Sequence, residues 1–206
     1  GVCVANGNVT MIGGTVGSNK AITGDGGGIY ASAENQNVTV EILSGNITNN
    51  SAYKSGGAFA VVGRTGGTED ITVTLGVNEQ HIDENGNRVE CKHGNESIHT
   101  TTCPVITFNT AQVSGGAIYI TGGKSTKLNL YCLEEANNKA EDGESRSNFM
   151  MVDGGTILLS TVENKDPSKP SIEGLCSINN SIHVTAGAMD LYGSMSNPKI
   201  EAPITV

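Results

Sequence analysis

A pattern of asparagine, glycine and small residues recurs along this chain, and it constrains the fold more than any other feature. It reads asparagine, any residue, a small or apolar residue, three further residues, Gly-Gly or Ala-Gly, a small residue and an apolar run. Copies begin at Asn50, Asn109, Asn148 and Asn180, with a looser copy from Asn19. Such self-similarity is typical of solenoids. We expect one repetitive domain over 1–197 and a cap or linker at 198–206.

Short strand-like runs fill each repeat. The run Val38-Thr39-Val40-Glu41-Ile42 alternates apolar and polar residues, as does Ile71-Thr72-Val73-Thr74-Leu75. Alternation with period two is a strand signature, and no segment shows the 3.6-residue period of a helix. Hairpin turns between successive runs are mostly missing. The pattern predicts an all-β fold, a right-handed parallel β-helix of the pectin-lyase-like type with about five coils.

The spacing of the repeated asparagines is uneven. Successive copies are 31, 59, 39 and 32 residues apart, so two intervals exceed the base period. The excess follows the runs that end at Leu75 and Tyr131. We predict insertions at 76–104 and 133–147, which leave the same corner of consecutive coils and lie side by side. A third excursion, 162–171, is expected at a different corner.

The repeated residues have predicted structural roles. An asparagine at the same turn of every layer can donate to and accept from its neighbours above and below, which forms a ladder. Glycine permits positive φ or a close backbone approach. The predicted ladder and corner residues are Asn19, Asn50, Asn109, Asn148, Asn180, Gly27, Gly57, Gly116, Gly155 and Gly187.

Charge excludes some partners. The formal net charge is -9, with only 12 lysines and arginines in 206 residues. This leaves no basic stripe to neutralise phosphates, which argues against nucleic acid and anionic membrane surfaces. No run approaches the roughly 18 apolar residues of a membrane-spanning helix, so no membrane span is expected.

The larger insertion holds most of the candidate binding residues. Asn85-Gly86 lies between two strand-like runs and predicts a hairpin that stands off the solenoid. The predicted contact residues, all polar or charged, are His81, Asp83, Glu84, Asn85, Arg88, Glu90, His93, His99, Glu134, Glu135 and Asp142.

The same insertion leaves three chemical alternatives open. Cys91 and Cys103 are disulfide candidates, since closing such a loop would stabilise an exported protein, and free thiols are an alternative. Together with His93 and His99 they could instead surround zinc, although the spacing matches no common finger. Asp83, Asn85, Asn87 and Glu90 resemble a calcium loop, and a plain hairpin explains them equally well. We assign no cofactor.

The Gly-Gly-Ala-Ile element at 115–118 and the apolar-x-x-Asn element at 47–50 resemble the paired motifs of chlamydial polymorphic outer-membrane proteins. Related glycine-repeat solenoids occur in surface proteins of other bacteria. The resemblance implies a secreted or cell-surface-anchored adhesin-like segment of a larger bacterial protein. Its implied partner is a host or bacterial surface protein or a glycan, contacted through the lateral insertions.

An enzyme is the alternative, because β-helices also host polysaccharide lyases and glycosidases. Glycoside hydrolysis needs two carboxylates about 5–9.5 Å apart. Asp25 and Asp153 occupy predicted corners three coils apart, which is about 14 Å at the usual strand spacing. The sequence leaves catalysis undecided and favours a non-enzymatic adhesin or spacer, with a carbohydrate-binding or polysaccharide-degrading module as the alternative.

Overall fold

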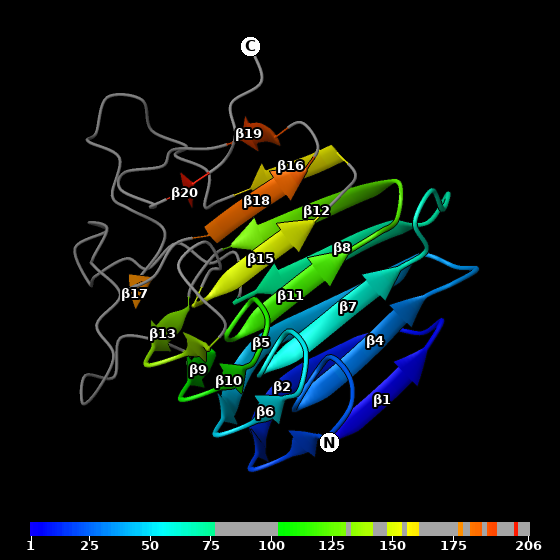
Figure 1. Cartoon of the computed structure of the whole chain (residues 1–206). Helices are drawn as coiled ribbons and strands as arrows, with labels where there is room; N and C mark the ends of the chain where they lie inside the picture. Colours follow the sequence, from blue (N-terminus) through cyan, green and yellow to red (C-terminus); the bar gives the residue numbers. More distant parts are fainter. Residues whose placement is uncertain are drawn as a thin grey trace, which may run out of the picture.

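The computed structural model describes residues 1–76, 103–130, 133–141 and 148–153, together with the backbone of strands at 156–160, 177–178, 182–186, 189–192 and 200–201. These residues form parallel β-strands, with no helix among them (Figure 1). Every strand pair within this part of the chain is parallel. The expectation of an all-β fold of parallel strands is therefore confirmed.

The strands form three sheets. The first sheet runs, in spatial order, through β1 (Val2–Ala5), β4 (Ile29–Ala33), β7 (Phe59–Gly63), β11 (Ile118–Thr121), β15 (Met150–Asp153), β18 (Ile182–Ala186) and β20 (Ile200–Glu201). The second runs through β17 (Ser177–Ile178), β13 (Glu134–Ala136), β9 (Val105–Thr107), β5 (Val38–Thr48), β8 (Asp70–Leu75), β12 (Ser125–Leu130), β16 (Thr156–Ser160) and β19 (Met189–Tyr192), with β2 (Val9–Gly17) beside β5. The third runs through β14 (Lys139–Ala140), β10 (Thr110–Ala111), β6 (Ser51–Ala52) and β3 (Lys20–Ala21).

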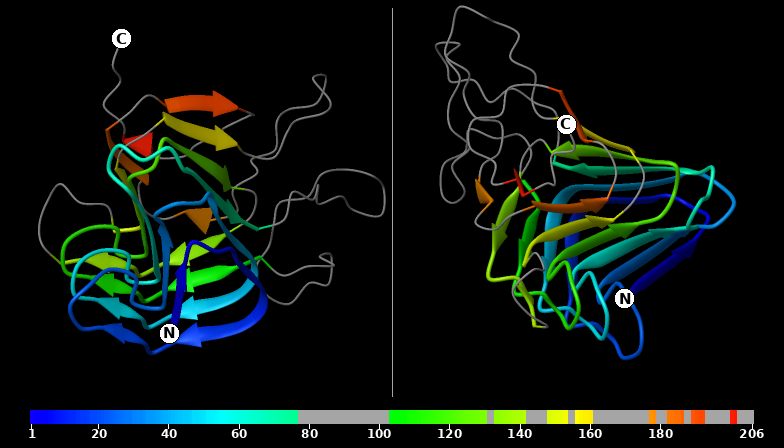
Figure 2. Two further views of the ribbon diagram at one scale, coloured as in Figure 1. Left: turned by 90° about the vertical axis from the view of Figure 1, so that its right-hand side faces the viewer. Right: turned by 45° about the horizontal axis from the view of Figure 1, so that its top comes forward.

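The chain passes through the first, second and third sheets in that order and then returns to the first. We call one such passage a layer. The layers are β1–β3, β4–β6, β7–β10, β11–β14 and β15–β17. Neighbouring layers are in register, since Ile29 pairs with Phe59 and Phe59 with Ile118. Figure 2 shows the N-terminal strands (blue) at one end of the stack and the later strands (yellow and orange) at the other. Within the part of the chain that is described, no helix could span a bilayer.

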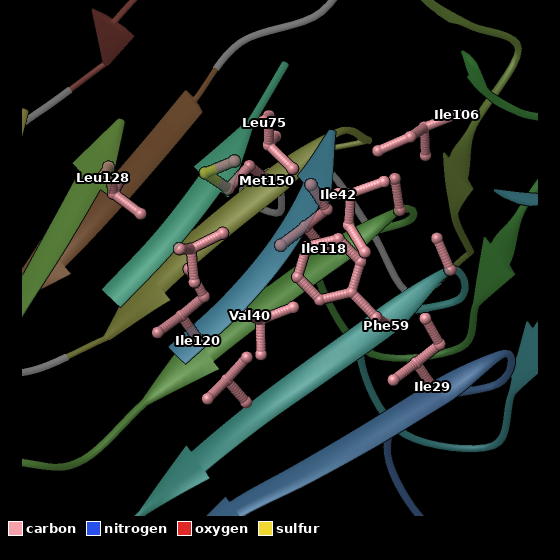
Figure 3. Packing of buried hydrophobic residues seen from close by; sticks show 14 of the residues in the cluster. Ile29, Val40, Ile42, Phe59, Leu75, Ile106, Ile118, Ile120, Leu128 and Met150 are labelled. Carbon is pink, nitrogen blue, oxygen red and sulfur yellow. The ribbon is translucent and has the colours of Figure 1, made fainter. Parts of the chain in front are cut away.

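Columns of apolar side chains fill the interior. Ile29, Phe59, Ile118 and Met150 stand above one another in the first sheet and are all buried. Figure 3 shows this column pointing toward side chains of the second sheet, among them Val40. Burying one such side chain stabilises the fold by roughly 1.5–3 kcal/mol. The alternation seen in the sequence is thus the alternation between this core and the outer face.

Paired glycines form the corner between the third and first sheets, and the two members of a pair differ in role. Gly56 has a φ of 71°, in the left-handed region that glycine adopts without strain. Its neighbour Gly57 lacks positive φ but lies against the next layer, where a Cβ would meet Gly116 O and, at 2.5 Å, Thr110 O. Gly27 and Gly116 have the same close approach. Gly155 and Gly187 lie outside the described residues.

The predicted insertion at 133–147 is wrong in its bounds. β13 and β14 occupy 134–140 and pair with β9 and β10, so this stretch belongs to the fourth layer. The prediction assumed that Gly154-Gly155 precedes a first-sheet strand, as Gly115-Gly116 precedes Ile118. Met150 pairs with Ile118, however, so in this layer the glycine pair comes after the start of the first-sheet strand. β20 lies within the expected cap or linker and pairs with β18.

The larger connections instead leave the second sheet at one repeated position. In the second layer only three residues, 43–45, separate Ile42, which pairs with Leu75, from Asn46, which pairs with Val105. The third layer has residues 76–104 at this position. The fifth layer has residues 162–176 there, because Asn129 pairs with Ser160 and Glu134 with Ser177. The excursion expected at 162–171 therefore begins at the same position of its layer as residues 76–104, two layers further on, and not at a different corner.

Candidate functional site

An asparagine ladder joins the first four layers. The main-chain N–H and the Nδ2 of Asn50 both donate to Oδ1 of Asn109, each at 3.0 Å. Asn19 makes the same pair of bonds to Asn50, and Asn109 makes them to Asn138. The Nδ2 groups of the three later rungs also donate to a carbonyl of the preceding layer, as Asn109 does to Ile47 O at 2.9 Å. Every polar side-chain atom of these buried rungs is thereby satisfied, as burial requires.

The fourth rung differs from the prediction. Asn138, and not Asn148, follows Asn109, and it donates to Glu135 Oε1 at 2.8 Å. Asn148 instead accepts a bond from the Ala140 N–H through its Oδ1, at 2.9 Å. A shorter signal, asparagine, any residue, alanine, marks all four rungs and could have identified this one: Asn19-Lys20-Ala21, Asn50-Ser51-Ala52, Asn109-Thr110-Ala111 and Asn138-Lys139-Ala140. Asn180 lies outside the described residues.

The residue before each rung turns the chain sharply. Ser18, Asn49, Phe108 and Asn137 all have φ between 56° and 58°. Side chains other than glycine and asparagine adopt this conformation at a cost of about 1–2 kcal/mol. The ladder bonds hold the turn in place. Phe108, which is 55% exposed, is the least suitable occupant, because bulky residues rarely adopt positive φ.

Most of the predicted contact residues lie outside the part of the chain that the structure describes. These are His81, Asp83, Glu84, Asn85, Arg88, Glu90, His93, His99 and Asp142, so their proposed role stays a prediction. The calcium and zinc alternatives stay open for the same reason. Cys91 also lies outside, and its pairing with Cys103 stays a prediction. Cys3, which no prediction used, is an exposed free thiol on β1.

Glu134 and Glu135 lie on strand β13, not in an insertion. Glu135 is fully buried on β13, at the position that Ile47 and Ile106 occupy in the layers before it. Its carboxylate accepts the bond from Asn138 and so closes the ladder. The expectation that Glu135 contacts a partner is therefore wrong. Glu134 is half-buried on the same strand.

A shallow depression on the outer face of the first sheet was missed by the sequence reasoning. It has a volume of about 310 Å³ and lies where β4 and β7 end. Its lining residues, which combine an aromatic ring with polar groups, are Tyr30, Ser32, Glu34, Asn35, Val62, Gly63 and Arg64. We call these seven residues the Tyr30 groove. The 30-residue offset between Ile29 and Phe59 is the signal that could have found it, because it places Glu34 beside Arg64.

The main chain of the Tyr30 groove is held firmly. The N–H groups of Glu34 and Asn35 donate to Asn6 Oδ1 at 2.8 and 2.9 Å. The carbonyl of Arg64 accepts bonds from Gly67 and Gly123. The pKa of Tyr30 is raised above its usual value, first by burial and then by the nearby charges of Asp25, Cys3 and Glu34. Its hydroxyl therefore keeps its proton throughout the physiological range.

Comparisons with family models, curated proteins and solved structures found no match for this chain. The functional argument therefore rests on the geometry of the layers and of the Tyr30 groove.

Proposed function

We propose that this chain is a right-handed parallel β-helix from a secreted or surface-anchored bacterial protein, and that it acts without catalysis as an adhesin-like scaffold or spacer. The observation that carries the proposal is the repetition in register of the layers. Each adds one strand to the first sheet and, through the first four layers, one rung to the ladder. Right-handedness follows the strong preference of connections between parallel strands.

The buried ladder supports a stiff structural role. Asn50, Asn109 and Asn138 are at most 4% exposed. Asn50 and Asn109 bond to the layers on both sides, and Asn138 bonds to the layer before it. Bending the stack would break these bonds and leave buried amides unsatisfied, at a cost of about 1–3 kcal/mol for each group. A stack of this kind holds whatever it presents at a fixed position.

The proposed contacts come from the connections that interrupt this regularity. Residues 76–104 and 162–176 replace a three-residue link at the same position of the third and fifth layers. Regular layers need no such additions for their own pairing, since the second layer closes with Leu43-Ser44-Gly45. The partner class is a surface protein or a glycan.

A loop graft tests the proposal. Replacing residues 76–104 by Leu-Ser-Gly gives the third layer the link of the second, and a shorter closed loop costs less entropy. We expect the graft to keep its β circular dichroism and cooperative unfolding. It should lose more than tenfold in affinity for the ligands that the wild-type chain binds on panels of purified surface proteins and glycans.

Two outcomes would contradict the proposed function. One is unchanged binding by the folded graft, which would remove residues 76–104 from the contact surface. The other is turnover of an acidic polysaccharide by the wild-type chain that disappears on Asp83→Asn. If the Leu-Ser-Gly graft does not fold, a second variant replaces residues 77–103 by a single serine and retains Gly76 and Pro104.

A further inference from the structure

The Tyr30 groove has a defined floor and rim. Ser32, which is 4% exposed, and the half-buried Val62 lie at its base on the neighbouring strands β4 and β7. The exposed residues Glu34, Asn35 and Arg64 line it where the two strands end, and we call them its rim. Its volume of about 310 Å³ matches the lower end of the range for small-ligand pockets, about 300–1,000 Å³.

The rim groups are free to bind a ligand. Within the described residues, the side chains of Glu34, Asn35 and Arg64 take part in no hydrogen bond or ion pair. Glu34 and Arg64 stand in adjacent layers, since Ala33 pairs with Gly63, yet they do not pair with each other. Their main chains are nonetheless fixed by Asn6, Gly67 and Gly123. The groove is thus preorganised, which lowers the entropy lost on binding.

We propose that the Tyr30 groove binds one residue of a neutral glycan. The ring of Tyr30 offers an apolar face for the C–H side of a pyranose and a hydroxyl at its edge. Sugar hydroxyls both donate and accept hydrogen bonds, so they match a rim that combines the acceptor Glu34, the donor Arg64 and the amide of Asn35.

Charge selects a neutral sugar over an acidic one. The single arginine of the groove stands against Glu34, and Asp25 lies close enough to influence Tyr30. The whole chain carries a net charge of -9, which repels polyanions such as polyuronates at long range. This site lies on the first sheet and does not use residues 76–104, so it goes beyond the contacts proposed above.

The test compares Tyr30→Ala with Tyr53→Ala, an exposed tyrosine outside the groove. Calorimetric titration uses neutral β-linked tetrasaccharides of glucose, xylose and mannose, with tetragalacturonate as the acidic probe. At least one neutral probe should bind the wild-type chain. Tyr30→Ala should weaken that binding at least tenfold, Asn35→Ala about threefold, and Tyr53→Ala not at all, with thermal midpoints confirming that each variant folds.

Three results would overturn the assignment: no neutral probe binds at millimolar concentration, tetragalacturonate binds more tightly than every neutral probe, or Tyr30→Ala and Asn35→Ala both bind like the wild-type chain. If Tyr30→Ala does not fold, Asn35→Ala and Arg64→Gln decide the question, because both side chains are exposed. The loop graft separates the two proposals. It should retain neutral-sugar binding at the groove even where it loses contacts made by residues 76–104.

Discussion

Asn109 donates both its main-chain N–H and its Nδ2 to Oδ1 of Asn138, at 3.0 and 2.9 Å, although 29 residues separate them. This pair of bonds joins the third layer to the fourth. Asn138 in turn bonds to Glu135, whose counterparts in the three preceding layers are the aliphatic residues Val16, Ile47 and Ile106. The layers are therefore locked at one corner by side chains as well as by their sheets.

Removing a central rung should be costly. Asn109→Ala leaves the N–H and the Nδ2 of Asn50 without their shared acceptor in a buried position. We expect the free energy of unfolding to fall by at least about 2–3 kcal/mol, measured by urea denaturation. The control is Asn19→Ala at the half-buried end of the ladder, which should cost about 1 kcal/mol or less. Equal losses for the two variants would argue against a continuous ladder.

A buried hydroxyl offers a stabilising substitution. Thr126 is fully buried on β12, and its Oγ1 has no hydrogen-bond partner in the described structure. Its neighbour in the column is Ile71, so Thr126→Val restores an apolar surface of the same shape. We expect the free energy of unfolding to rise by about 1–2 kcal/mol, because the desolvated hydroxyl is removed. Thr72→Val on the outer face should change it by less than about 0.5 kcal/mol.

The turn before the third rung offers a second stabilising substitution. Phe108 has a φ of 56° and is 55% exposed, so it bears backbone strain and buries less than half of its surface. Phe108→Asn should raise the free energy of unfolding by about 1 kcal/mol, because asparagine tolerates this conformation. The reverse change at an equivalent exposed turn, Asn137→Phe, should lower it by a similar amount. A loss of stability in Phe108→Asn would show that the ring makes contacts that matter more than the strain.

Tyr30 should make stability depend on alkaline pH. Its pKa is raised on folding, chiefly by burial and then by Asp25, so the unfolded chain releases this proton at a lower pH than the folded chain does. The contribution to stability is complete below the ordinary tyrosine pKa of about 10. It is lost as pH rises through the folded value.

Urea denaturation between pH 9 and 11, combined with tyrosinate absorbance, measures this effect. Tyr30→Phe should flatten the fall in stability, whereas Tyr53→Phe should leave the wild-type slope in place. A Tyr30→Phe variant with an unchanged slope would show that other groups dominate the alkaline titration.

The strands and the first three rungs could be predicted from the sequence, because alternating side chains and the recurring asparagine are signals contained within a single layer. The fourth rung was missed because the conspicuous Gly154-Gly155 pair outweighed the shorter match at Asn138-Lys139-Ala140. Where the chain departs from its period, only strand pairing shows which residues stand above one another. The Tyr30 groove was missed for the same reason, since Glu34 and Arg64 are neighbours only through the register of β4 with β7.

Hydrogen exchange of side-chain amides tests the layered structure most directly. The Nδ2 groups of Asn50, Asn109 and Asn138 lie in buried bonds between layers, whereas Asn35 is exposed. Nuclear magnetic resonance should find exchange at the three ladder amides slowed at least about 100-fold relative to Asn35, because exchange requires the layers to open. Exchange of all three at the rate of Asn35 would contradict the ladder and, with it, the register on which the proposed function rests.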